Sequence, residues 1–139
     1  MTYELLDHTA DVGFRATGET LADAFESATR AFADIVAYED PTEPTDELRV
    51  EVEADAEGED VDALLFDYLD RLIYTQDVEG VVVVDAEVEA DEKNLRLDAV
   101  LRVAPIGEDA YLDIKAPTYS EMRAERDDGG WTLEAVLDI

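Results

Sequence analysis

The residues best suited to do chemistry lie near the two ends of the sequence. His8 and Asp11 fall in the segment HTADVG, residues 8–13, and His8 is the only histidine. Asp138 and Ile139 close the sequence, and Ile139 is expected to add its terminal carboxylate. Carboxylate oxygens are the ligands that hard cations such as Ca²⁺ and Mg²⁺ prefer. These residues could therefore hold a divalent cation.

The setting of each acid matters more than the number of acids, because 38 of the 139 residues are Asp or Glu. Asp11 lies in a tight segment between two extended segments, beside Gly13. Asp138 is out of phase with the apolar residues of the last strand, such as Leu137. Structural interpretations stay open: a turn or cap for Asp11, a solvated acid for Asp138, and a hydrogen-bonded imidazole for His8.

Other kinds of site are excluded by residues that the sequence lacks. There is no cysteine, so disulfides, thiolate chemistry and Cys/His zinc sites are excluded. No Gly-rich phosphate loop of the G-x-x-x-x-G-K type is present. Ten Lys and Arg against 38 acids give a net charge of −28, which excludes a broad basic surface for nucleic acid.

The distribution of charge also indicates where the protein works. The acids are spread along the whole chain, and concentrated salt would screen their mutual repulsion. We therefore expect the cytosol of a salt-accumulating halophile; an acidic mesophilic protein is the alternative. No apolar run is long enough to span a membrane, and residues 1–7 lack the features of a signal peptide. The expected location is cytoplasmic, with no membrane partner.

Hydrophobic periodicity predicts the elements that must position these residues. Apolar residues at helical spacing predict helices over 21–36 and 61–73, the first with Thr20 as N-cap. Alternating apolar residues predict strands, the last of them over 131–139. Further extended segments are expected at 48–55, 80–90, 95–104, 111–116 and 121–125, with turns at 91–94 and 127–130.

The order of these elements predicts an α+β fold for a single domain, 1–139. The expected architecture is a two-layer sandwich: a mixed, mostly antiparallel sheet with two helices on one face. Parallel crossovers through the helices stay open, and so does the strand order.

Several segments, in order along the chain, resemble the archease family. The segment HTADVGF at 8–14 is similar to the opening signature of that family. GETLADAFESATRAF at 18–32 and LLFDYLDRLIYTQD at 64–77 resemble its two helices. DIKAPTYSEMRAE at 113–125 and LEAVLDI at 133–139 resemble its last two blocks. The resemblance spans nearly the whole chain.

The resemblance implies a function that the residues alone do not show. Archeases are small α+β proteins, without an established reaction of their own, that assist the GTP- and Mn²⁺-dependent RNA ligase of tRNA splicing. They promote guanylylation of the ligase and let it turn over repeatedly. The implied partner is that ligase, with tRNA contacted only indirectly. Alternatives are a stand-alone metal-dependent phosphoesterase and a chaperone of RNA-modification enzymes.

The resemblance also implies which residues form the site. Asp11, Asp138 and Ile139 correspond to the family's metal ligands, with Ca²⁺ the first expectation and Mg²⁺ or Mn²⁺ the alternatives. For this we expect the exit of the first strand to neighbour the last strand. Supporting or partner-facing roles are expected for four residues: His8, Lys115, Thr118 and Tyr119. For residues 115–119 a plain strand end and turn is the alternative interpretation. Ser120 departs from the family, which usually has His there.

Overall fold

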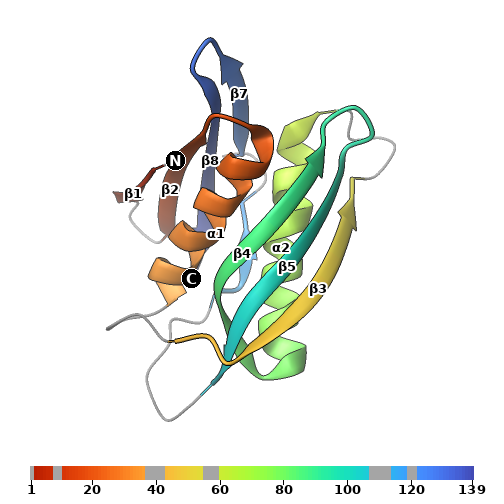
Figure 1. The fold of residues 1–139 in the computed structure, drawn as a ribbon. Coiled ribbons are helices and arrows are strands. Elements are labelled where there is room, and N and C mark those ends of the chain that lie inside the picture. Colours follow the sequence, from red (N-terminus) through yellow and green to blue (C-terminus); the bar gives the residue numbers. More distant parts are fainter. Residues whose placement is uncertain (1, 8–10, 37–42, 55–59, 107–113, 119–121) are drawn as a thin grey trace.

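The computed structural model describes residues 2–7, 11–36, 43–54, 60–106, 114–118 and 122–139. Within them the chain forms two helices and eight strands (Figure 1). No helix among the described residues is long and apolar enough to cross a membrane. In chain order the elements are β1 (Tyr3–Asp7), β2 (Asp11–Gly18), α1 (Leu21–Val36), β3 (Asp46–Glu53), α2 (Val61–Glu79), β4 (Val81–Asp91), β5 (Arg96–Pro105), β6 (Ala116–Pro117), β7 (Arg123–Asp127) and β8 (Gly130–Asp138).

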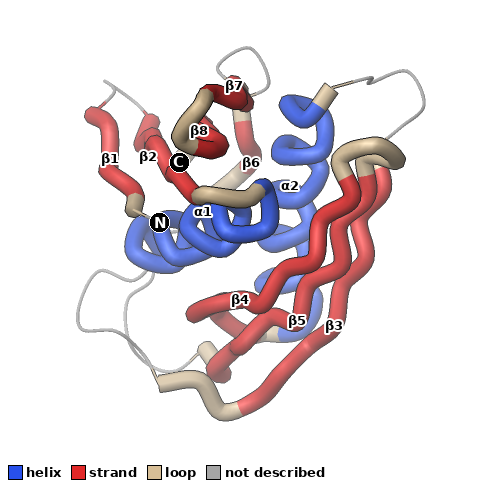
Figure 2. The backbone as a smooth tube through the Cα atoms, turned by 45° about the horizontal axis from the view of Figure 1, so that its top comes forward, coloured by secondary structure: helices blue, strands red, loops and turns tan. Residues whose placement is uncertain are grey.

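The α+β class is confirmed, but the strands form two sheets where the sequence predicted one. The first sheet has the order β1-β2-β8-β6, with β7 also paired to β8. The second sheet has the order β3-β5-β4. Every strand pair in the described residues is antiparallel, in line with the mostly antiparallel pairing expected, and the parallel crossovers that the sequence left open are not found there. The helices lie between the sheets, and α1 contacts β2 and β8 on one side and β4 on the other (Figure 2).

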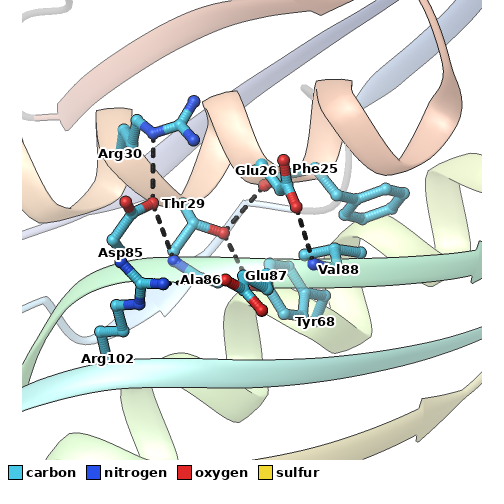
Figure 3. Close-up of polar contacts among 10 residues, drawn as sticks. All are labelled: Phe25, Glu26, Thr29, Arg30, Tyr68, Asp85, Ala86, Glu87, Val88 and Arg102. Carbon is cyan, nitrogen blue, oxygen red and sulfur yellow. Dashed lines mark hydrogen bonds and ion pairs between the residues drawn. The ribbon is translucent and has the colours of Figure 1, made fainter. Parts of the chain in front are cut away.

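Side chains occupy the outer edge of β4, which explains why the second sheet ends there. Arg30 Nε, on α1, donates to Asp85 Oδ1 at 3.1 Å (Figure 3). The N–H of Val88 donates to Glu26 Oε2, also on α1, at 2.9 Å. Once its N–H groups have side-chain partners, an edge cannot template another strand. Two more N–H groups on β4 are bound in this way: Ala86 by Asp85 Oδ1 at 2.8 Å, and Val83 by Gln76 Oε1 at 3.0 Å.

The core lies where α1 and α2 meet between the sheets. Tyr68 on α2 is fully buried, and its ring stands edge-on to Phe25 of α1 at 5.5 Å between centroids. The Tyr68 hydroxyl is 2.6 Å from the hydroxyl of Thr29, which donates to the Phe25 carbonyl at 2.8 Å (Figure 3). Burial raises the pKa of Tyr68 far above its usual value, so the phenol stays neutral.

Both helices begin where the sequence predicted. The Thr20 hydroxyl accepts the N–H of Asp23 at 3.1 Å, which confirms its N-cap role. Helix α2 is capped by Asp60, which accepts from Ala63, and it runs to Glu79, further than the predicted 73. Strands β6 and β7 fall within or beside the predicted extended segments, whereas residues 111–113 lie outside the described part of the chain.

Asp62, in the first turn of α2, closes the edge of β7 and gives a testable pH dependence. Its carboxylate accepts the N–H of Ala124 at 2.6 Å. Burial raises the pKa of Asp62 above 3.8, and the nearby charge of Asp60 raises it further. The folded state therefore holds the proton more tightly, and this contribution to stability is lost as pH rises through the raised pKa.

Asp62→Asn is accordingly expected to be more stable than the parent chain at neutral pH, by less than about 1 kcal/mol because the carboxyl is partly exposed. The amide keeps an acceptor for Ala124 and removes the charge. Urea unfolding from about pH 4 to pH 7 would show a flatter profile for Asp62→Asn. Asp62→Ala is the control, since it also removes the acceptor and should cost about 1–2 kcal/mol. A steeper profile for Asp62→Asn than for the parent would contradict this account.

Candidate functional site

The first sheet brings together two of the acids singled out from the sequence. Asp11 is the first residue of β2 and Asp138 is the last residue of β8, and the two positions are directly paired in the antiparallel register. Directly paired positions belong to the same face of a sheet. Ile139 follows Asp138 immediately and is partly exposed. The expected closeness of Asp11 and Asp138 is found in the backbone pairing, but the expected strand partner is wrong, because β8 pairs with β2 and not with β1.

Residues 114–118 run along the other side of β8, beside the same end. Ala116 is paired with Asp138. The N–H of Lys115 donates to the Asp138 carbonyl at 2.9 Å, and the N–H of Thr118 donates to the Val136 carbonyl at 2.8 Å. The structure thus brings the backbone of Lys115 next to Asp138 and that of Thr118 next to Val136, two residues before it.

Two predicted site residues, His8 and Tyr119, lie outside the part of the chain that the structure describes, and so does the side chain of Asp11. Ser120 is not among the described residues either. Asp11 is described through its backbone only. Among the side chains described, no group of three or more Asp, Glu, His or Cys is clustered closely enough to hold a metal ion, and Asp11 and His8 are outside that comparison.

The electrostatics of the first sheet leave Asp138 without a basic partner among the described residues. Its side chain is exposed and makes no ion pair or hydrogen bond with them. Arg15, four positions along β2 from Asp11, binds Glu134 at 2.5 Å and also contacts Glu4. The hydrogen bond to Glu134 raises the pKa of Arg15, so this guanidinium is fixed as a cation between two carboxylates.

The chemistry of this donor set fits a hard cation. We call Asp11, Asp138 and Ile139 the carboxylate end of the first sheet. Its potential ligands are carboxylate and backbone oxygens, which suit Ca²⁺, Mg²⁺ and Mn²⁺ and do not suit softer metals. Lys115 makes no ion pair within the described residues, so its ammonium is not committed to another acid there.

Two grooves lie elsewhere on the described surface, and the sequence did not predict either. One, of about 530 Å³, lies between β3 and α2. The other, of about 410 Å³, lies beside the β7–β8 turn, where Arg126 stacks on Trp131 at 4.9 Å and pairs with Glu92 at 2.6 Å. The first had a signal in the sequence: Tyr74 and Val78 fall outside the apolar stripe of the second helix, and both are 58% exposed.

Known proteins resemble this chain over nearly its whole length. A family model described as the archease protein family (MTH1598/TM1083) matches residues 3–139. Protein archease of Pyrococcus furiosus is 35% identical over 145 residues, covering 99% of this chain and 98% of the relative. Protein archease of Archaeoglobus fulgidus is 36% identical over 141 residues, covering 100% of both chains.

Solved structures agree with these sequence matches. The solution structure of protein 1598 from Methanobacterium thermoautotrophicum has a TM-score of 0.78 at 29% identity, covering 99% of this chain and 98% of that one. The crystal structure of an archease from Thermotoga maritima, described as a possible chaperone, has a TM-score of 0.66 at 21% identity, covering 96% and 94%. The second likeness concerns the fold alone. With the family model matched from residue 3 to residue 139, the chain belongs to the archease protein family.

Proposed function

We propose that this protein is an accessory protein of the RNA ligase that seals tRNA exons, and that it binds a divalent cation at the carboxylate end. The observation that carries the proposal is the direct pairing of Asp11 with Asp138. Two acidic positions side by side repel one another unless a cation lies near them. The described residues offer no arginine for this purpose, because Arg15 is held by Glu134 and Glu4.

Asp11, Asp138 and Ile139 are the proposed ligands, the last through its backbone or terminal carboxylate. The cation is Ca²⁺, or Mg²⁺ or Mn²⁺ in its place, and bound there it would neutralise charge on phosphoryl oxygens. Backbone hydrogen bonds hold the end of β8 that carries Asp138. The N–H of Lys115 donates to the Asp138 carbonyl at 2.9 Å, and the N–H of Thr118 donates to the Val136 carbonyl. His8 and Tyr119 are proposed to face the partner or support this end.

The charge of the protein supports contact with a protein partner and not with tRNA directly. At −28 the surface repels a phosphate backbone, so RNA is reached only through the ligase. The cytoplasm of a salt-accumulating cell is the proposed setting, since salt screens this charge. In this role the protein promotes ligase guanylylation and multiple turnover and catalyses no reaction alone. A chaperone role, suggested by the description of the Thermotoga maritima protein, is the second candidate.

Replacing Asp138 is expected to weaken cation binding strongly. Asp138→Asn removes the charge and one oxygen ligand at an exposed position, so the fold should persist and the Ca²⁺ dissociation constant should rise at least about tenfold. Calorimetric titration with Ca²⁺, then Mg²⁺ and Mn²⁺, measures it, and Asp11→Asn should behave alike. The matched control is Asp128→Asn in the β7–β8 turn, which changes the net charge equally. Affinity equal in Asp138→Asn and Asp128→Asn would reject the site.

The ligase role is tested separately by exon ligation with the cognate ligase in concentrated KCl. With the ligase limiting, addition of this protein should raise the yield beyond one turnover, and Asp138→Asn should do so less well. A single-turnover assay of ligase guanylylation tests the step itself. Equal yields with and without the protein would reject the ligase role. Hydrolysis of a phosphodiester by the protein alone would favour the phosphoesterase alternative.

A further inference from the structure

The outer edge of β3 differs from the outer edges of β4 and β7, which side chains occupy. The edge of β4 is occupied by Glu26, Asp85 and Gln76, and that of β7 by Asp62. Strand β3 pairs with β5 only, and none of the described residues hydrogen-bonds to its other side. An open strand edge carries a row of unpaired N–H and C=O groups, which another extended chain can bind.

The direction of these backbone groups follows from one hydrogen bond. The N–H of Ala54 donates to the Leu95 carbonyl at 2.9 Å, towards β5. Since N–H direction alternates along a strand, the N–H groups of Glu53, Glu51 and Arg49 point to the open side. These three donors, with the carbonyls of the same residues, form a ladder that is available to a partner strand.

A groove of about 530 Å³ follows the C-terminal half of this edge. One wall is β3, with Glu51 and Glu53, and the other is α2, with Asp70, Arg71 and Tyr74. Tyr74 is 58% exposed, with the Arg71 guanidinium 5.9 Å from its ring centre. Val78, one turn further along α2, is also 58% exposed. The groove therefore places an open strand edge beside the exposed ring of Tyr74, with Val78 exposed just beyond its lining.

The two faces of strand β3 carry different side chains. Exposed residues of β3 include three acids and one base, which alternate with buried residues such as Val50 and Val52. The exposed set is Glu47, Arg49, Glu51 and Glu53. A strand added to this edge would have the same alternation. One row of its side chains would lie along the acids, and the other would face Tyr74 and Val78. Basic residues suit the first row and apolar residues suit the second.

We propose that the β3 edge binds an extended segment of a partner protein, about as long as β3, in which basic and apolar residues alternate. Charge argues against a second copy of this chain as the occupant, since the exposed row of β3 holds three acids and only one base, Arg49, so pairing β3 with β3 would still leave acids opposite acids. The site lies on the opposite side of the molecule from β1 and β2, in the views of both Figure 1 and Figure 2. It is therefore independent of cation binding at the carboxylate end.

The test is titration of the isotope-labelled protein with a peptide of alternating Lys and Val, eight residues long to match β3. The control peptide contains the same residues in two blocks, so it has equal charge but no alternation. The alternating peptide should change the amide chemical shifts along β3 and at Tyr74. The block peptide should produce changes of the same size only at about tenfold higher concentration. Moderate KCl limits binding through the overall charge.

Variants separate backbone pairing from attraction by charge. Glu51→Pro removes an outward N–H and leaves the bonds to β5, as proline on an edge strand allows, so affinity should fall at least about tenfold. Glu51→Gln keeps the N–H and should weaken binding only about twofold, as should Asp128→Asn far from the edge. Equal affinity for the two peptides, changes spread evenly over the surface, or full affinity in a folded Glu51→Pro would each overturn the proposal. If Glu51→Pro does not fold, the proposal is decided by the peptide-induced amide shift changes in the parent chain alone.

Discussion

Gly130→Ala is expected to lower the free energy of unfolding by about 4 kcal/mol or more, a large effect for a single methyl group. Gly130 has φ +127°, a backbone conformation that L side chains rarely adopt. A Cβ there would stand 2.2 Å from the Gly18 carbonyl oxygen and 2.9 Å from the Glu19 Cα. Both contacts are with backbone, so neither can be relieved by rotating a side chain.

Two other glycines separate the contributions of strain and of contact. Gly129, the preceding residue, would bring its Cβ within 3.4 Å only of the Asp127 carboxylate, so Gly129→Ala should change stability by less than about 0.5 kcal/mol. Gly80 ends α2 with φ +65° and open space around it, so Gly80→Ala should cost about 1 kcal/mol. Urea unfolding of the three variants measures the series. A Gly130→Ala variant no less stable than Gly80→Ala would contradict the steric argument.

The close approach at Gly130 matters for the candidate site because both belong to one ladder. Strands β2 and β8 pair from Gly18 with Trp131 at one end to Asp11 with Asp138 at the other. A slip of one residue would move every β8 side chain to the other face and set Asp11 opposite a neighbour of Asp138. Contact between the backbones at Gly18 and Gly130 favours the observed register, and so keeps the two acids paired.

Local sequence patterns predicted most of the elements but not how the strands are shared between sheets. Thr20 and Asp60 mark the helix starts, and β8 follows the alternation of its apolar residues. The division into two sheets depends on contacts such as Glu26 with Val88, which join residues 62 apart in the chain. No local pattern carries that information, because an acid on a helix surface has the same appearance whether it faces water or a strand edge.

The candidate site shows the same division between local and long-range information. The apolar phase of the last strand singled out Asp138, and the tight segment before Gly13 singled out Asp11. Their direct pairing needs the register of β2 on β8, which periodicity alone does not fix. The β3 edge was not predicted, because an edge is defined by which strands are absent beside it. The only sequence signal for a surface groove was that the apolar residues Tyr74 and Val78 fall outside the apolar stripe of the second helix.

Raising KCl from about 0.1 M to about 2 M is expected to raise the Tm by about 10 °C or more, since the Debye length falls from about 10 Å to about 3 Å or less. The net charge is −28, and acids repeat along the exposed face of β4, as at Glu87 and Glu89. The ion pairs of the described residues neutralise few of these charges, and their partners are mostly exposed. Folding brings the remaining acids closer together, so screening stabilises the folded state more than the unfolded one.

Removing unpaired acids should reproduce part of this effect without salt. Glu47, Glu53 and Glu89 are exposed and make no ion pair within the described residues, so the triple Gln variant should have a higher Tm at low KCl and nearly the parent Tm at high KCl. A chelator keeps the carboxylate end free of divalent cations, and glucose at equal osmolality reports any stabilisation unrelated to charge. An equal rise in glucose, or one unchanged in the triple variant, would mean that charge screening is not the cause. Then the acidity would be explained by solubility or docking, and the inference of a salt-accumulating cell would lose its physical basis.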